Sequence, residues 1–242
     1  MPLRGVVTKA AFVLLLAVFL LGVPRIAGMV ASFVDYQVID PDGAYAWITV
    51  HHVVQATMIL VCIVLIRRYT PLEFGLGWGD KERGKRYVAL FVLGFTIYTG
   101  FAYLILFLTD TFQPFNYPLT AVNITGQLGF QLFLSGPSEE LIFRAFAITL
   151  LSYILTRRVF GGKVSIANII AAVIFGLAHV QFSVILFAAV YDPFQVIYAT
   201  VLGLFYGDCF EKTNSVIYPM IMHSFTNILM VGVQITVTFF LV

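Results

Sequence analysis

Long apolar runs constrain this chain more than any other feature of its sequence. Of its 242 residues, 60% are hydrophobic and only 11% are charged, and each run is close to the roughly 20 residues that cross a bilayer core as a helix. Lipid offers the backbone no hydrogen-bond partners, so helices are the expected structure. The alternating segments of a transmembrane β-barrel do not occur. The expected spans are residues 10–34, 45–66, 87–109, 138–156, 164–180, 193–210 and 215–240.

Two further apolar segments, 121–134 and 181–191, are short for a span. Each is expected to be a half-helix, a re-entrant piece or an extension of its neighbour. The sequence therefore predicts an all-α, polytopic transmembrane helix bundle with seven or eight spans, in one integral membrane domain that covers residues 1–242. In a prokaryote, such a multi-pass protein would lie in the plasma membrane.

The placement of charge predicts how the bundle is oriented. Six basic residues gather in the connection 67–86, whereas the loop 35–43 carries three aspartates. By the positive-inside rule the connection is cytoplasmic and the loop lies on the other side, which puts the N-terminus in the cytoplasm as well. The formal net charge of +2 gives no reason to expect a nucleic-acid partner.

Charged residues inside an apolar run are the strongest indication of function. In SGPSEELIFRAF, Glu139, Glu140 and Arg144 fall within six positions, although a charge at the centre of a span costs about 2.5 to 3.5 kcal/mol. Such residues usually face a bundle interior or a wet cavity. Glu140 and Arg144 share a helix face and can form an ion pair, whereas Glu139 points about 100° away and stays available for chemistry. Residues 135–138 are expected to start a helix, with a serine cap and a proline in the first turn.

The chain has four histidines, and two of them strengthen this interpretation. His179 and His223 lie in apolar segments, and Asn227 follows His223 by one helical turn. His51 and His52 lie near an end of the second span and are interpreted as interfacial or packing residues.

Three short motifs, taken in order, resemble one family of membrane proteases. Together they resemble the CPBP family of CAAX proteases and bacteriocin-processing enzymes, which includes type II CAAX prenyl endopeptidases. The resemblance covers about residues 135–230. The residues that carry it are Glu139, Glu140 and Arg144, then Phe175 and His179, then His223 and Asn227.

The resemblance implies a glutamate-dependent intramembrane endopeptidase with an α-helical fold. Glu139 and His179 would hold and deprotonate the attacking water, and His223 and Asn227 would donate hydrogen bonds to the oxyanion. The substrate would be a peptide or a prenylated protein, and removal of the C-terminal tripeptide of a prenylated CAAX-type substrate is the specific hypothesis.

The same resemblance gives the two remaining charged residues supporting roles. Glu140 would support the catalytic pair, and Arg144 would anchor both glutamates. The chemistry agrees, because hydrolysis of a peptide bond needs a general base and donors aimed at the developing oxyanion. No serine or cysteine has a comparable placement beside a base, and no HExxH zinc motif occurs, so neither a cofactor nor a metal is expected.

Three alternatives stay open on the sequence. A zinc peptidase could use Glu139, His179 and His223 as ligands with an open fourth position. A non-catalytic scaffold or partner-binding membrane protein could keep the same residues as a structural polar cluster. A proton-coupled transporter would also use buried charges, but the chain lacks the inverted repeats typical of transporters.

Overall fold

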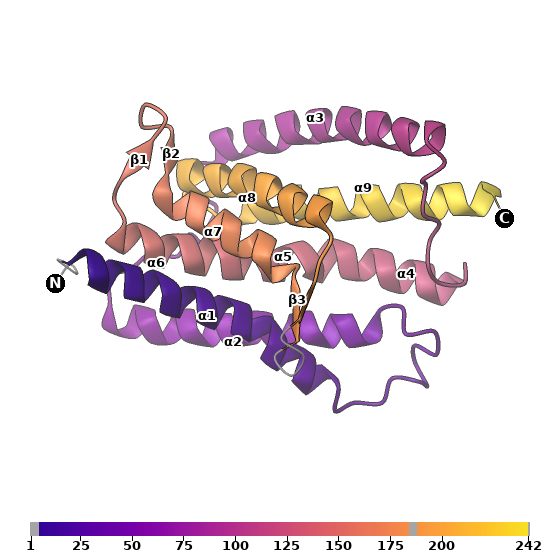
Figure 1. Cartoon of the computed structure of the whole chain (residues 1–242), viewed down its shortest axis with the longest axis horizontal. Helices are drawn as coiled ribbons and strands as arrows, with labels where there is room; N and C mark the ends of the chain where they lie inside the picture. The colour runs from indigo at the N-terminus through magenta and orange to yellow at the C-terminus, as the bar shows by residue number, and fades with distance from the viewer. Residues whose placement is uncertain (1–4, 184–187, 242) are drawn as a thin grey trace.

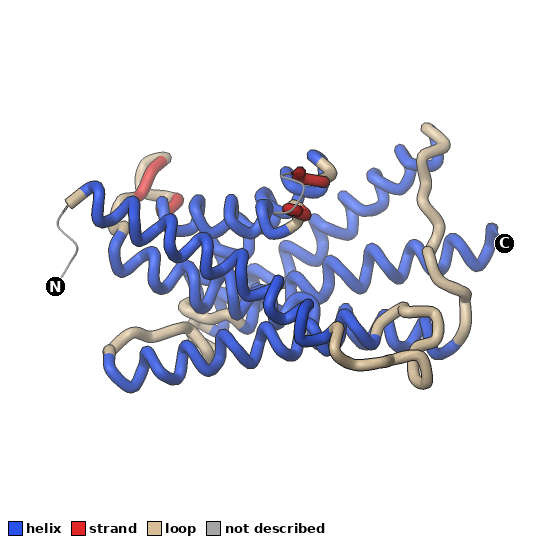
Figure 2. Tube along the Cα trace, turned by 60° about the horizontal axis from the view of Figure 1, so that its bottom comes forward, coloured by secondary structure: helices blue, strands red, loops and turns tan. Residues whose placement is uncertain are grey.

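The computed structural model describes residues 5–183 and 188–241. Most of these residues form helices that lie roughly along one common axis (Figure 1 and Figure 2). The prediction of an all-α, membrane-type bundle is confirmed. Within the described residues, four helices are long and apolar enough to cross a membrane. They are α1 (Val6–Ala31), α2 (Ala46–Tyr69), α3 (Lys81–Leu108) and α9 (Ile217–Leu241).

The predicted number of seven or eight spans was too high by this measure. The α7 helix (Ile166–Ala178) has 13 residues, and at 1.5 Å per residue it covers about 20 Å, short of the roughly 30 Å bilayer core. The α8 helix (Pro193–Thr213) has 21 residues but is less apolar, because polar residues such as Gln195 and Asp208 interrupt it. A further long helical stretch, residues 121–154, carries two glutamates and an arginine.

That stretch is a continuous helical run at the centre of the bundle. It begins at Ala121, where the Thr120 hydroxyl accepts a hydrogen bond from the Asn123 N–H at 3.2 Å. The prediction of a helix start at 135–138 was therefore wrong, and the segment 121–134 extends its neighbour. In chain order the run consists of α4 (Ala121–Phe130), the π-helical segment η1 (Gln131–Ser135), α5 (Gly136–Glu140), the π-helical segment η2 (Leu141–Phe146) and α6 (Ala147–Ile154).

The π-helical segments give this run an irregular backbone beside the two glutamates. Pro137 lacks an N–H, and its ring crowds the carbonyl four residues earlier, so the helix passes it by widening in η1. Side chains take up carbonyls in the widened turn. Ser224 Oγ of α9 donates to Leu132 O at 2.8 Å, and Ser138 Oγ donates to Ser135 O at 3.2 Å. Glu139 thus lies in mid-run, away from a helix N-terminus.

Small residues bring neighbouring helices close to this run. A Cβ on Gly136 would lie 2.8 Å from the backbone nitrogen of Ser224, so only glycine allows α5 to approach α9 this closely. A Cβ on Gly203 would lie 3.2 Å from Ala172 Cα, and α8 packs on α7 there. The first contact holds α9 directly against the run, and the second holds α8 against α7.

Short strands complete the described residues. β1 (Arg158–Val159) pairs antiparallel with β2 (Val164–Ser165). β3 (Gln181–Ser183) pairs antiparallel with β4 (Ala188–Val190), and residues 184–187 between them lie outside the described part. For the segment 181–191, the interpretations as a half-helix or a helix extension are therefore wrong.

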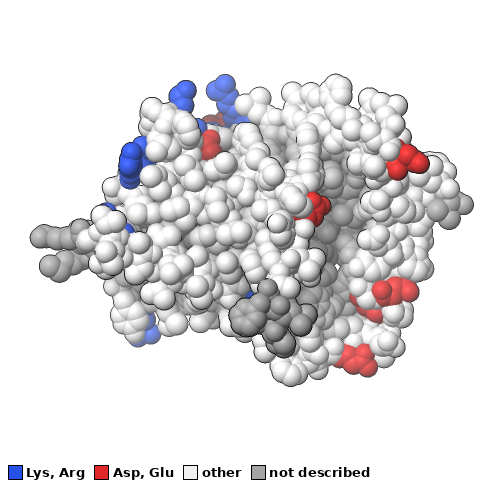
Figure 3. Space-filling view, viewed as in Figure 1, with Lys and Arg blue, Asp and Glu red and all other residues white. Residues whose placement is uncertain are grey.

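Charged side chains gather at the two ends of the bundle. In Figure 3, Lys and Arg lie mainly around the end that carries the start of α3 and the β1–β2 hairpin, and Asp and Glu dominate the opposite end. The basic end is the end that the positive-inside rule predicts to be cytoplasmic.

Candidate active site

A fully buried ion pair fixes one of the two adjacent glutamates. The side chains of Glu140 and Arg144 are both 0% exposed, with Arg144 Nε 2.9 Å from Glu140 Oε2 and Nη2 3.2 Å from Oε1. The guanidinium group lies over the ring of Phe175 at 4.7 Å and near the ring of Tyr206 at 5.7 Å. Because the Glu140 carboxylate is neutralised and has no access to water, it is suited to a structural role.

His223 connects the two glutamates. Its Nδ1 donates a hydrogen bond to Glu140 Oε1 at 2.9 Å, and its Nε2 lies 3.8 Å from Glu139 Oε2. The imidazole stacks on Tyr206 with ring centroids 5.1 Å apart. The buried carboxylate therefore sets the orientation of the ring, and the ring turns its second nitrogen toward Glu139.

Glu139 has the more open environment of the two glutamates. Its side chain is 21% exposed, and its nearest basic groups lie 3.8 and 4.0 Å away, beyond a direct hydrogen bond. It lines a cavity of about 450 Å³ between α1, α2, α5 and α7. A carboxylate with access to a wet cavity and no close partner can accept a proton from water.

His52 is the second imidazole beside Glu139, with its Nε2 4.0 Å from Oε1. Its Nδ1 lies 2.6 Å from Ser138 Oγ, and Gln55 Nε2 lies 2.9 Å from both of these atoms. This polar group connects α2 to the residue that immediately precedes Glu139, so α2 positions the carboxylate from the side opposite α9.

The sequence interpretation missed this role, because it took His52 for an interfacial or packing residue. The contact with Ser138 joins positions 86 residues apart, and no spacing rule covers such a distance. One signal was present. His52 and Gln55 are three residues apart in an otherwise apolar span, so both polar side chains lie on one helix face.

His179 lies at the C-terminal end of α7 and lines the same cavity as Glu139. Its Nδ1 is 3.0 Å from the carbonyl oxygen of Phe175. A carbonyl only accepts, so Nδ1 carries the hydrogen and Nε2 keeps a free lone pair. Among the described residues, His179 makes no contact within 4.0 Å of a carboxylate, so it shares the cavity with Glu139 without touching it.

Asn227 lies one turn beyond His223 on α9. Its Nδ2 donates to Ser135 Oγ at 2.9 Å, and neither Asn227 nor His223 lines the 450 Å³ cavity. The amide still has a second hydrogen to donate. The structure thus brings Glu140, Arg144 and His223 into direct contact. Glu139 lies 3.8 Å from His223, His179 lines the same cavity as Glu139, and Asn227 lies outside the lining of that cavity.

A preformed metal site is not part of this arrangement. In residues 5–183 and 188–241, no three His, Cys, Asp or Glu side chains are placed to hold one ion together. The zinc hypothesis, with Glu139, His179 and His223 as ligands, therefore has no assembled ligand set.

Comparison with known families gives one match. Residues 121–229 match the family model described as type II CAAX prenyl endopeptidase Rce1-like. This part of the chain is similar to that family. No curated protein and no solved structure matches the chain.

The Rce1-like match extends from the start of α4 into α9 and confirms the resemblance to CAAX proteases. Together with the four apolar helices, this similarity supports an integral membrane protein and a protease, and peptide or prenylated substrates are the substrate class of the matched family. His52 lies outside the matched residues. All six predicted site residues lie within them, namely Glu139, Glu140, Arg144, His179, His223 and Asn227.

Proposed function

We propose that this protein is an intramembrane glutamic endopeptidase in which Glu139 activates the attacking water. The observation that carries the proposal is the unequal environment of two adjacent carboxylates. Glu140 is fully buried against Arg144 and His223, whereas Glu139 is partly exposed in a cavity and flanked by imidazoles. One glutamate is thus committed to structure, and the other is available as a base.

The attacking water would lie between Glu139 and His179. The free lone pair of His179 Nε2 can accept one hydrogen bond from it, and the Glu139 carboxylate can accept its proton as the oxygen attacks the peptide carbonyl carbon. The separation of the two side chains across the cavity supports this role, because a direct contact would leave no room for a water.

The oxyanion that forms needs donors with fixed directions. His223 can donate from Nε2 when both of its ring nitrogens carry hydrogen, with Nδ1 donating to the Glu140 carboxylate. Asn227 can add its free amide hydrogen from one turn away. Protonated Glu139 then returns its proton to the amide nitrogen, the C–N bond breaks, and a carboxylic acid and an amine leave.

Arg25 of α1 supports a substrate with a free C-terminal carboxylate. This arginine lines the same cavity as Glu139, and Nη1 and Nη2 donate to the carbonyls of Phe182 and Val180, each at 3.1 Å. Among the described residues it makes no ion pair. Guanidinium groups bind carboxylates by charge-assisted hydrogen bonds. A C-terminal tripeptide, cleaved from a prenylated CAAX-type end, would present such a group.

The test is hydrolysis of a fluorescence-quenched, farnesylated CAAX peptide by the detergent-purified protein. Glu139→Gln keeps the shape of the side chain and removes the base, so cleavage should fall by about 10²–10⁴-fold. Glu82→Gln, a change at an exposed carboxylate of α3, serves as the matched control and should cleave like the wild type.

A chelator separates this proposal from the zinc alternative. Cleavage should survive chelator; loss that Zn²⁺ restores would instead favour a metallopeptidase. A folded wild-type protein that cleaves no farnesylated peptide would count against this substrate. If Glu139→Gln also left biological function intact, the scaffold interpretation would replace the enzyme.

A further inference from the structure

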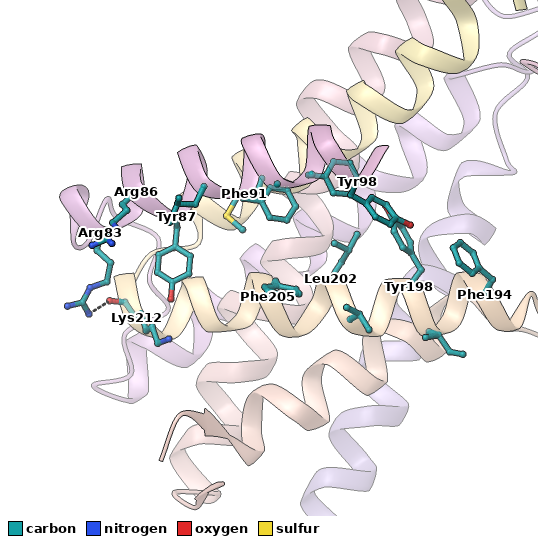
Figure 4. A pocket seen from close by; sticks show the side chains of 16 residues that line it. Arg83, Arg86, Tyr87, Phe91, Tyr98, Phe194, Tyr198, Leu202, Phe205 and Lys212 are labelled. Atoms are coloured by element: carbon teal, nitrogen blue, oxygen red, sulfur yellow. Dashed lines mark hydrogen bonds between the residues drawn. The ribbon is translucent and has the colours of Figure 1, made fainter. Parts of the chain in front are cut away.

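A second cavity, larger and almost entirely apolar, lies along α3 and α8. Its volume is about 860 Å³, and Figure 4 shows side chains from both helices facing each other along its length. Basic side chains lie at one end, near the start of α3 and the end of α8. The aromatic rings that line the rest belong to Phe91, Phe95, Tyr98, Phe194, Tyr198 and Phe205.

This groove is separate from the candidate active site. Glu139, His179 and His52 all line the 450 Å³ cavity, and none of them lines the groove. Met222 of α9 lines the groove, whereas the next residue, His223, points to the glutamates. The prenyl thioether of a CAAX-type substrate would lie next to the cleaved bond, in the cavity beside Glu139, and this cavity shares no lining residue with the groove.

The length of the groove matches one leaflet of a bilayer. Arg83 and Tyr98 line its two ends on α3 (Figure 4). Their separation of fifteen residues corresponds to about 22 Å along the helix, close to half of the roughly 40–45 Å bilayer with its headgroups. Many of the lining side chains, such as Phe205 at 58% exposed and Phe194 at 68%, have no protein cover. In a membrane, an acyl chain would cover them.

The basic end of the groove carries an unneutralised positive charge. Arg83 Nε lies 3.6 Å from Asp80 Oδ2, and Lys212 Nζ lies 2.9 Å from Asp208 Oδ2. Among the described residues, Arg86 makes no ion pair and no side-chain hydrogen bond. This end also belongs to the connection predicted to be cytoplasmic, on the side where anionic lipids concentrate.

We propose that the groove binds one anionic phospholipid of the cytoplasmic leaflet, with an acyl chain along the aromatic side chains and the phosphate at Arg86. The charge favours an anionic headgroup over a zwitterionic one, and the length favours a lipid tail that starts at the membrane surface. The proposal does not depend on the peptidase activity, because the groove shares no residue with the active-site cavity.

The test is native mass spectrometry of the full-length protein, purified in detergent and titrated with phosphatidylglycerol or phosphatidylcholine. We expect phosphatidylglycerol to bind more tightly, and Arg86→Gln to weaken its binding by about fivefold, the effect of one basic residue beside an anionic surface. Arg68→Gln, at an exposed arginine of the same end outside the groove, is the control and should bind like the wild type.

A second pair of variants tests the groove itself. Gly94 lines it, and a Cβ there would meet nothing within 4 Å, so Gly94→Phe should fill the space and abolish tight phosphatidylglycerol binding. Gly100 is equally open on the same helix but outside the groove, and Gly100→Phe should change nothing. Equal binding of both lipids, equal losses in Arg86→Gln and Arg68→Gln, or displacement of phosphatidylglycerol by a farnesyl peptide would overturn the proposal.

Discussion

The two cavities of this protein lie in the same bundle but differ in the helices that build them. The apolar groove lies between α3 and α8, two regular helices, and apart from basic side chains at one end its walls are aromatic and aliphatic. The active-site cavity borders the central run, where π-helical segments flank the glutamates and polar side chains from α2, α7 and α9 converge. Regular helices suffice to hold an apolar chain, whereas the placement of reactive groups here depends on an irregular backbone and on buried charge.

The largest expected effect comes from removing the buried charge that supports the catalytic cavity. Arg144→Ala leaves Glu140 buried with His223 as its remaining basic partner, and breaking such a pair typically costs about 3–5 kcal/mol of unfolding free energy. Unfolding in mixed micelles measures the loss. Lys85→Ala is the matched control, because the exposed pair with Glu82 should contribute little to the unfolding free energy. Equal losses of unfolding free energy in the two variants would show that the buried pair stabilises the fold no more than the exposed pair does.

Loss of the proposed oxyanion donor Asn227 should have the second-largest effect. Asn227→Ala should lower turnover by about 10²–10³-fold, the usual scale for one such donor. Phosphatidylglycerol binding in the groove should not change, because Asn227 lies outside it. A rise in KM with unchanged kcat would mean that Asn227 contributes to substrate binding and not to the transition state.

Removal of the imidazole from α2 should have a smaller effect on turnover. His52 acts through the position of Glu139, so we expect His52→Ala to lower kcat by up to about tenfold, comparable to the loss of the neutral hydrogen bond with Ser138, with little change in KM. His51→Ala provides the control, since His51 lines the cavity but does not contact Glu139. If His51→Ala lowered kcat equally, the effect would come from cavity shape and not from positioning.

An effect of about the same size concerns the end of the substrate. Wild-type protein should prefer a farnesylated peptide with a free C-terminal carboxylate over its amide by about tenfold in kcat/KM, the value of one charge-assisted contact. Arg25→Gln should remove that preference while leaving cleavage of the amide nearly unchanged. Equal cleavage of both peptides by the wild type would remove Arg25 from the account but not the peptidase.

The sequence allowed much of this molecule to be predicted, because strong local patterns govern the long helices. Apolar runs predicted α1, α2, α3 and α9, and the four-residue spacing of Glu140 and Arg144 predicted their ion pair. These features depend on residues close together in the chain.

The parts that escaped prediction depend on contacts between distant segments. The helix passes Pro137 without stopping because η1 widens and Ser224 of α9 takes up a carbonyl there. His52 reaches Ser138 across 86 residues, and within the apolar segment 181–191 residues 181–183 pair with 188–190 as strands. Apart from the three-residue spacing of His52 and Gln55, none of these outcomes has a signal in local spacing.

The central claim is that two adjacent glutamates divide chemistry and structure between them. The most direct measurement compares single-turnover cleavage of the farnesylated peptide by Glu139→Gln and Glu140→Gln, together with the unfolding free energy of each. We expect Glu139→Gln to fold normally and lose cleavage by about 10²–10⁴-fold, and Glu140→Gln to lose stability while it retains measurable cleavage. Equal abolition of cleavage in two variants that both fold normally would contradict the division.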